Sequence, residues 1–220
     1  MYLTVWAVRL KAEGMDEEHA PRTKRAQIID AALWEFQEKG FALAHMDQIS
    51  LRAGVSKRTL YKHFESKENL FHSIVEALSL RIQDTLELRY ERDRDIEAQL
   101  TALAWAEGRL FMSPEVMAMS RMIISETLRN PALAAEIQGR IDKKPAFTAM
   151  LKAAAADGQL EISDPDAAAD EFIALIKAKA FWPVVFGADI VSESRMADIV
   201  QSSVDMIMCR YAPGAPVKPC

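Results

Sequence analysis

The sequence predicts an all-α protein, with an N-terminal three-helix helix-turn-helix domain joined to a larger helical domain and about nine helices in total. Three observations predict this class. The composition is rich in the helix formers Ala, Leu, Glu, Lys and Met, with only eight glycines in 220 residues. No segment alternates apolar and polar residues between hairpin turns, as strands do. Helix start and stop signals recur along the chain, with Ser, Asn or Asp before proline at starts and glycine at ends.

The expected helices follow these signals in order. A first helix with an apolar stripe begins near Arg22 and is closed by Gly40. Beyond the helix-turn-helix, the expected segments are Lys67 to about Tyr90, Ile96–Met112, Pro114–Arg129, Pro131 to about Asp157, Asp166–Phe186 and Ser192 to about Arg210. Pro145 lies inside one of these segments and predicts a kink or a break there. Gly187 is expected to end the helix that precedes it.

The stretch 46–64 has the pattern of two short helices joined by a tight turn. Apolar residues at helical spacing end at Gly54, which tolerates the positive φ that such a turn requires. Ser56 is a good N-cap for the second helix. Leu60 and Phe64 lie four residues apart and are expected to face inward together. The stretch therefore predicts a helix-turn-helix.

Polar side chains are left on the outer face of the second helix, where a helix-turn-helix contacts DNA. The N-terminal residues of that helix reach base edges in the major groove. Lys57 and Arg58 can donate to guanine O6 and N7, and Thr59 can meet a thymine methyl group. The predicted DNA-binding residues are Ser56, Lys57, Arg58, Thr59, Tyr61, Lys62, His63 and Lys67, together with His45, which can donate to phosphate when protonated.

The same stretch resembles the DNA-binding domain of TetR-type transcriptional repressors, over about Arg22 to Leu80. The resemblance is carried by Ala53-Gly54-Val55-Ser56, Thr59-Leu60-Tyr61, His63-Phe64 and Ser66-Lys67. It implies that Tyr61 and Lys67 touch backbone phosphates. The chain departs from the family at Ala44-His45, where Thr or Ser usually caps the helix, and this leaves the phosphate contact at that position open.

Charge is distributed unevenly along the chain. The net charge is −5, but residues 22–67 hold nine Lys or Arg against five Asp or Glu, a net charge of +4. The remainder must then carry −9. A basic N-terminal module on an acidic body is the asymmetry expected of a DNA-binding domain fused to another domain.

The predicted domain plan has four parts: residues 1–20 as an N-terminal extension, 21–67 as the helix-turn-helix domain, 68–211 as the regulatory and dimerisation domain, and 212–220 as a flexible Pro-rich tail. The first ten residues are apolar but fit neither a signal peptide nor a membrane span. Two alternatives remain for residues 1–20: a disordered extension before a usual start at Met15, or an extra turn that packs on the body or reaches DNA.

The body is similar to an AefR-like TetR C-terminal domain, on the pattern of Pro114, Asn130-Pro131, Gly158-Gln-Leu160 and Asp164-Pro165. This resemblance implies a homodimer in which the last two helices form a four-helix bundle. The predicted interface residues are Phe172, Ile176, Phe181, Val185, Met196, Val200 and Val204. The alternative is that these side chains form an intramolecular core.

The body is also the predicted site for a small apolar effector, because methionine adapts to varied apolar ligands and the chain has eleven of them. The candidate pocket residues are Trp105, Phe111, Met112, Met119, Met122, Met150 and Trp182. The alternative is that they are ordinary core.

The motifs of enzymes are missing from the sequence. The histidines are His19, His45, His63 and His72, and the cysteines are Cys209 and Cys220, so the body has no zinc spacing, no nucleophile motif and no phosphate loop. We therefore expect no metal, no cofactor, no enzymatic activity and a reducing cytoplasm. The predicted function is a ligand-responsive regulator, in the role of a repressor, that binds a palindromic DNA operator as a dimer. The alternative is a helical structural or protein-interaction protein whose helix-turn-helix does not bind DNA.

Overall fold

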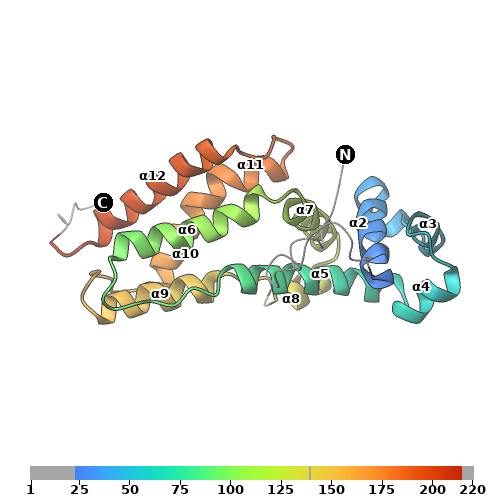
Figure 1. Ribbon diagram of the computed structural model, residues 1–220, viewed down its shortest axis with the longest axis horizontal. Coiled ribbons are helices and arrows are strands. Elements are labelled where there is room, and N and C mark those ends of the chain that lie inside the picture. The colour runs from blue at the N-terminus through green and yellow to red at the C-terminus, as the bar shows by residue number, and fades with distance from the viewer. Residues whose placement is uncertain (1–22, 139, 215–220) are drawn as a thin grey trace. The chain divides into compact units, whose positions relative to one another are not determined.

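A computed structural model (Figure 1) describes residues 23–138 and 140–214. Every regular element in this part of the chain is a helix, from α2 to α12, which confirms the predicted fold class. The expectations for residues 1–20 and for most of the tail, 215–220, lie outside the described residues. No helix in the described part combines the length and the apolar content needed to cross a membrane.

The chain divides into two compact units. Among the described residues, the first unit holds 23–78 together with Ala118–Ile137, and the second holds Ser79–Met117, Gln138 and 140–214. The division therefore falls inside two continuous helices, α5 (Lys67–Thr85) and α7 (Pro114–Arg129), and the domain boundary after residue 67 stays a prediction. Each of these helices contributes residues to both units.

The first unit is built on α2 (Lys24–Leu43), α3 (Met46–Arg52) and α4 (Lys57–His63), with the start of α5, the end of α7 and most of α8 (Pro131–Gln138). The predicted stripe of the first helix is buried, at Ile28, Ile29, Ala32, Leu33 and Phe36. Gly40 interrupts α2 with φ 74° and ψ 161°, as expected for a residue that closes a helix.

The second unit contains α6 (Ile96–Met112), α9 (Lys144–Ala156), α10 (Pro165–Ala180), α11 (Trp182–Val185) and α12 (Glu193–Tyr211). Helix α10 contacts α6, α9 and α12, and α6 also lies alongside α12 (Figure 1). Phe147 and Phe172 are fully buried between α9 and α10, with ring centroids 5.4 Å apart in an edge-to-face arrangement. The unit is thus a layered helical body around α10.

Helix α5 ends at Thr85, earlier than the predicted end near Tyr90. The connection that follows is held by side chains from the second unit. Tyr90 Oη donates to Asp157 Oδ2 at 2.8 Å, and Arg92 Nε lies 2.6 Å from Asp157 Oδ1. The buried Gln99 accepts from the backbone N–H of Glu91 at 2.7 Å and donates to its carbonyl at 2.9 Å. These tertiary hydrogen bonds replace the helical ones that another turn would have formed.

Proline divides two of the predicted helical segments. The break expected near Pro145 is confirmed, since α8 ends at Gln138 and α9 begins at Lys144. The single helix expected over Asp166–Phe186 was wrong, because α10 ends at Ala180 and α11 starts at Trp182. Pro183 has no N–H to donate to the preceding turn, and its ring would collide with the carbonyl four residues earlier.

Most residues predicted for the dimer interface lie instead in the core of the chain itself. Phe172, Ile176, Met196, Val200 and Val204 are at most 1% exposed, and Phe181 is 7% exposed. Val185 is half-buried. A side chain that is already covered by its own chain has almost no surface to bury against a second copy, so the burial of these six residues favours the intramolecular alternative.

Candidate nucleic-acid interface

The turn between α3 and α4 depends on the backbone conformation of Gly54. Its φ is +63°, and a Cβ placed there would meet nothing within 4 Å. Conformation rather than space therefore requires glycine at this position. The turn is closed by a hydrogen bond from Gly54 N–H to Leu51 O at 3.2 Å and another from Val55 N–H to Ser50 O at 3.1 Å. Ile49 and Leu60, fully buried, form the inner side of the motif.

Ser56 caps α4 as predicted. Its Oγ accepts the backbone N–H of Thr59 at 3.1 Å, and the two hydroxyl oxygens lie 2.9 Å apart. This hydrogen bond satisfies one of the N–H groups that have no partner within the first turn of a helix. The start of α4, where base contacts are expected, is therefore held in a fixed conformation before DNA arrives.

We expect Ser56→Ala to lower the free energy of unfolding of the first unit by about 1 kcal/mol, the usual cost of losing an N-cap hydroxyl. Chemical denaturation followed by circular dichroism measures the loss. Ser56→Asp keeps an acceptor at the same position and serves as the matched control, with stability close to the original. Equal stability of the Ala and Asp variants would show that the Ser56 hydroxyl does not cap the helix.

The predicted base-reading and phosphate residues of α4 mostly face solvent. Lys57, Arg58, Lys62 and His63 are exposed, Tyr61 is 48% exposed, Thr59 is half-buried, and Leu60 and Phe64 are buried as expected. One partner was missed by the sequence analysis. Lys57 Nζ lies 2.6 Å from Asp47 Oδ2 of α3, so the ammonium group is paired with a carboxylate before any DNA is bound. Both groups are exposed, which makes the pair weak and easily exchanged.

Lys67 has a different set of partners from those the sequence suggested. Its ammonium group donates to Phe41 O at 2.6 Å, Ala42 O at 3.0 Å and Ala44 O at 3.2 Å. It also lies 4.7 Å from the centre of the Phe41 ring. All three N–H donors are used, so the side chain fastens the start of α5 to the end of α2. Its contact with a phosphate stays a prediction, and a direct one would have to replace one of these bonds.

His45 is the residue before α3, with extended backbone (φ −119°, ψ 132°) and no side-chain capping bond. It lies with Tyr61 and Lys67 on the wall of one surface hollow of about 490 Å³, which is also lined by Ala44, Met46, Asp47 and Gln48. Three of the predicted phosphate ligands are thus brought together at the start of α3. Imidazole and phenol donors in a concave surface can hold an anion, although Asp47 opposes this.

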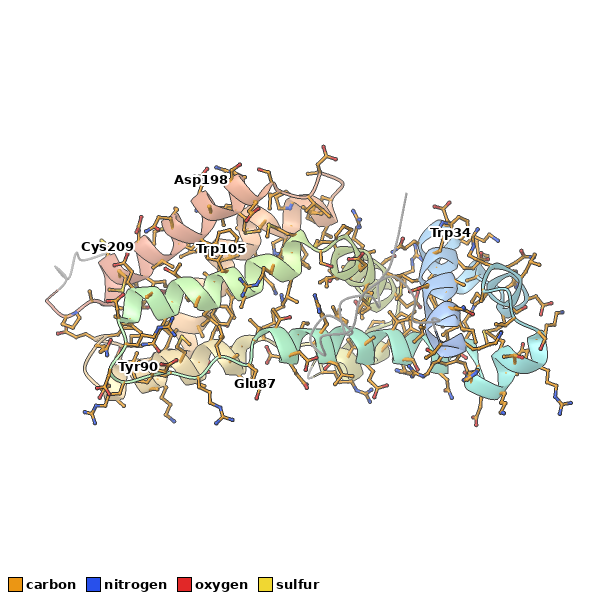
Figure 2. All side chains as sticks on the ribbon, in the orientation of Figure 1. Trp34, Glu87, Tyr90, Trp105, Asp198 and Cys209 are labelled. Atoms are coloured by element: carbon orange, nitrogen blue, oxygen red, sulfur yellow. The ribbon has the colours of Figure 1, made fainter. Side chains whose placement is uncertain are left out.

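The candidate pocket residues are divided between the two units. Met119 and Met122 belong to the first unit, and the other five belong to the second. Phe111, Met119, Met122 and Met150 are buried, Trp105 (Figure 2) and Met112 are half-buried, and Trp182 is 42% exposed. Met150 also lines a hollow of about 330 Å³, together with Leu88 and Ala102 and with charged groups such as Arg89 and Arg94. The ordinary-core alternative therefore fits the four buried residues, except where Met150 reaches this hollow.

No group of three His, Cys, Asp or Glu side chains suited to a metal occurs among residues 23–138 and 140–214.

Two family models match the chain. Residues 28–74 match the model described as bacterial regulatory proteins, tetR family. Residues 98–213 match the model described as AefR-like transcriptional repressor, C-terminal domain. The first match contains α3 and α4, and the second contains α9, α10 and α12.

Comparison with individual proteins also finds transcriptional regulators. The HTH-type transcriptional regulator UidR of Escherichia coli (strain K12) is 31% identical over 132 residues, which are 58% of this chain and 63% of UidR. The aligned part thus spans less than two thirds of that relative. A TetR family transcriptional regulator from Pseudomonas syringae pv. tomato str. DC3000 has a TM-score of 0.73 and 32% identity, covering 88% of this chain and 100% of its own. The flavonoid-responsive regulator FrrA has a TM-score of 0.69 and 29% identity, covering 87% of this chain and 98% of its own.

Proposed function

We propose that this chain, which belongs to the TetR family of bacterial regulatory proteins, is an effector-responsive transcriptional regulator that binds a palindromic DNA operator as a homodimer and acts as a repressor. The observation that carries the proposal is the α3–turn–α4 motif, with its capped second helix and its exposed basic side chains. A role as a repressor is in keeping with the description of the matching C-terminal family model. A catalytic activity is no part of the proposal.

In this proposal the residues of α4 divide into two groups. Lys57, Arg58 and Thr59, in the first turn, reach base edges in the major groove. The phosphate contacts come from Ser56, Tyr61, Lys62, His63, Lys67 and His45, which fix the register of the motif on DNA but carry no sequence information. Lys57 must leave Asp47 to reach a base, and this exchange makes its contribution smaller than that of Arg58, which has no ion-pair partner among the described residues.

The proposal includes a homodimer because a single helix-turn-helix of this size contacts few base pairs. A dimer places two recognition helices about 34–36 Å apart on a palindrome. Exposed apolar side chains of the second unit support an interface near α10 to α12, since Trp182 is 42%, Phe186 83% and Met206 52% exposed. The Trp182 and Phe186 rings are stacked, with centroids 6.1 Å apart. These three side chains take the place of the buried residues first expected there.

An effector can change DNA binding only if it favours one conformation of the chain over another. The second unit is the proposed effector-binding part, and the relative FrrA is described as flavonoid-responsive. Helix α5 contributes residues to both units, so a shift of α5 is the proposed route from effector to DNA-binding motif. An apolar effector that binds the DNA-free conformation more tightly would release the operator.

The test is binding of the full chain to labelled DNA from the intergenic region beside its own gene, measured by fluorescence anisotropy at several salt concentrations. We expect affinity to fall about 10³- to 10⁵-fold between 50 and 200 mM salt for about six to ten phosphate contacts per dimer. Unrelated DNA of the same length is the control and should bind more weakly at every salt concentration. If neither DNA shows salt-sensitive binding, the regulator proposal is wrong and the protein-interaction alternative takes its place.

A further inference from the structure

Three charged side chains of the second unit lie close enough to influence one another electrostatically, and we call Glu107, Lys143 and Lys177 the buried charge cluster. They come from α6, from the residue that precedes α9, and from α10. The Glu107 side chain is 0% exposed and that of Lys143 is 11% exposed. The Lys143 Nζ lies 3.4 Å from Glu107 Oε1, a long distance for a charged pair that is so well buried.

The hydrogen-bonding capacity of the buried charge cluster is mostly unused. Glu107 Oε2 is buried and has no hydrogen-bond partner among the described residues. In the same part of the chain, the ammonium of Lys143 has one acceptor for its three donors, Glu107 Oε1, and that of Lys177 has none. Buried polar groups in native proteins are nearly always satisfied, by protein groups or by ordered water, so these unmet donors and acceptors can take a further polar partner.

Two aromatic rings lie beside the ammonium groups. The Phe111 and Phe181 ring centroids are 5.0 Å apart, and both side chains are buried. Lys143 Nζ lies 4.0 Å from the Phe111 centroid and 6.0 Å from the Phe181 centroid. Lys177 Nζ lies 5.5 Å from the Phe181 centroid. The ammonium groups therefore lie against apolar ring surface that the chain itself buries.

We propose that the buried charge cluster binds the acidic head group, a carboxylate or a phenolate, of an apolar effector, with Lys143 and Lys177 as the anion ligands. The inference rests on the proposed function, because it specifies the chemical class of the effector. Two ammonium groups and one carboxylate leave a net charge of +1 in a largely apolar surrounding, and one anion would neutralise it. A cationic head group would be repelled by both lysines.

Burial and pKa agree with this assignment. Lys177 is half-buried and Lys143 keeps some exposure, so the lysines lie on the side that solvent reaches, whereas Glu107 is enclosed. Burial lowers the pKa of Lys143 to about 8, although Glu107 partly opposes this. Burial also raises the pKa of Glu107. A bound anion would favour the charged form of Lys143, and a hydroxyl on the ligand could donate to Glu107 Oε2.

A purely structural role would make a different prediction. If the pair of Glu107 and Lys143 only fastened the start of α9 to α6, Lys177 would be dispensable, because it has no ion-pair partner among the described residues. Replacing Lys177 also leaves no buried charge without its partner. Lys177→Gln is therefore the most informative variant, since it removes a proposed ligand without breaking the buried pair.

The experiment uses the full chain and three naphthalene probes that differ in the charge of the head group: 2-naphthoate, the neutral 2-naphthamide and the cationic 2-naphthylmethylammonium. Octanoate and octanamide form a second, non-aromatic pair. Calorimetric titration at pH 7 should show each carboxylate binding at least tenfold more tightly than its amide, and the cation most weakly. Pentafluorophenol, which is ionised at pH 7, compared with phenol, which is neutral there, tests a phenolate ligand at a pH below the pKa of Lys143.

Lys177→Gln should weaken carboxylate binding at least tenfold, and the double variant Glu107→Gln/Lys143→Gln should do the same. Lys152→Gln, which removes an exposed lysine of α9, is the matched control and should leave binding unchanged. Carboxylates that bind no better than amides, or binding that Lys177→Gln leaves intact, would overturn the proposal. Anion binding is measured without DNA, so a failure of the regulator proposal would appear separately, in the DNA titration. A bound carboxylate that left operator affinity unchanged would overturn its assignment as the effector.

Discussion

Lys143→Met is expected to lower the free energy of unfolding by about 3 to 5 kcal/mol, because it leaves Glu107 buried without its cation. Glu107 is 0% exposed, and its Oε2 already has no partner among the described residues. The methionine would fill much of the lysine stem's volume, so lost packing is a small part of the effect. Urea denaturation of the full chain at fixed protein concentration, followed by tryptophan fluorescence, measures the change.

The control is the double variant Glu107→Leu/Lys143→Met, which removes both charges. It should be close to the original protein in stability, since an apolar replacement of a buried pair is often neutral or stabilising. The two single variants and the double variant form a cycle that isolates the coupling between the side chains. A loss below about 0.5 kcal/mol for Lys143→Met would place the pair among weak surface pairs and contradict the burial argument.

The stability that Lys143→Met loses should also depend on pH. Burial raises the pKa of Glu107 above its ordinary value of 4.5, so the folded state holds a proton that the unfolded chain releases. Without Lys143 this difference becomes larger, and stability falls as the pH rises above 4.5 through the raised pKa. The variant should therefore be closest to the original protein near pH 5 and furthest from it near neutral pH.

The sequence was most informative where local chemistry decides structure. The turn at Gly54, the cap at Ser56 and the inward face at Leu60 each depend on residues within a few positions of one another, and all three predictions are confirmed. A positive φ, a hydroxyl acceptor before a helix and a spacing of four residues are readable without knowledge of the rest of the chain. The fold class followed from the same signals repeated along the body.

Structural features that depend on contacts between distant parts of the chain could not be predicted from local sequence signals. The end of α5 at Thr85 is set by hydrogen bonds to Asp157 and Gln99, and no helix-breaking residue marks it in the sequence. The pairing of Glu107 with Lys143 joins residues 36 positions apart. Pro183, in contrast, is a local signal for the break between α10 and α11.

Apolar periodicity shows that a helix has an apolar face but does not show what covers that face. Phe172 and Val200 are covered within the chain, whereas Trp182 and Phe186 are exposed. The sequence pattern is similar for both groups, because burial in a core and burial in an interface require the same side chains. In the proposed dimer, the exposed apolar residues therefore replace most of the residues first predicted for the interface.

Leu60→Ala is expected to remove operator binding by unfolding the helix-turn-helix. Leu60 is fully buried in a helix of only seven residues, so α4 has little else to hold it in place. Truncating a buried leucine to alanine costs about 2 to 5 kcal/mol, through lost apolar burial and the cavity left behind. Hydrogen–deuterium exchange over residues 46–64 should become fast, while peptides of the second unit keep their protection.

Arg58→Ala is the matched contrast, because Arg58 is exposed two residues earlier in the same helix. It should leave stability within about 0.5 kcal/mol of the original, as surface substitutions usually do. Its operator affinity should fall by about 1 to 3 kcal/mol through the loss of one base contact. Leu60→Met, which conserves volume, should retain most of both properties. If Leu60→Ala lost operator affinity while exchange over residues 46–64 stayed slow, Leu60 would act at the DNA surface and not in the core, and the division of α4 into a buried face and a reading face would be wrong.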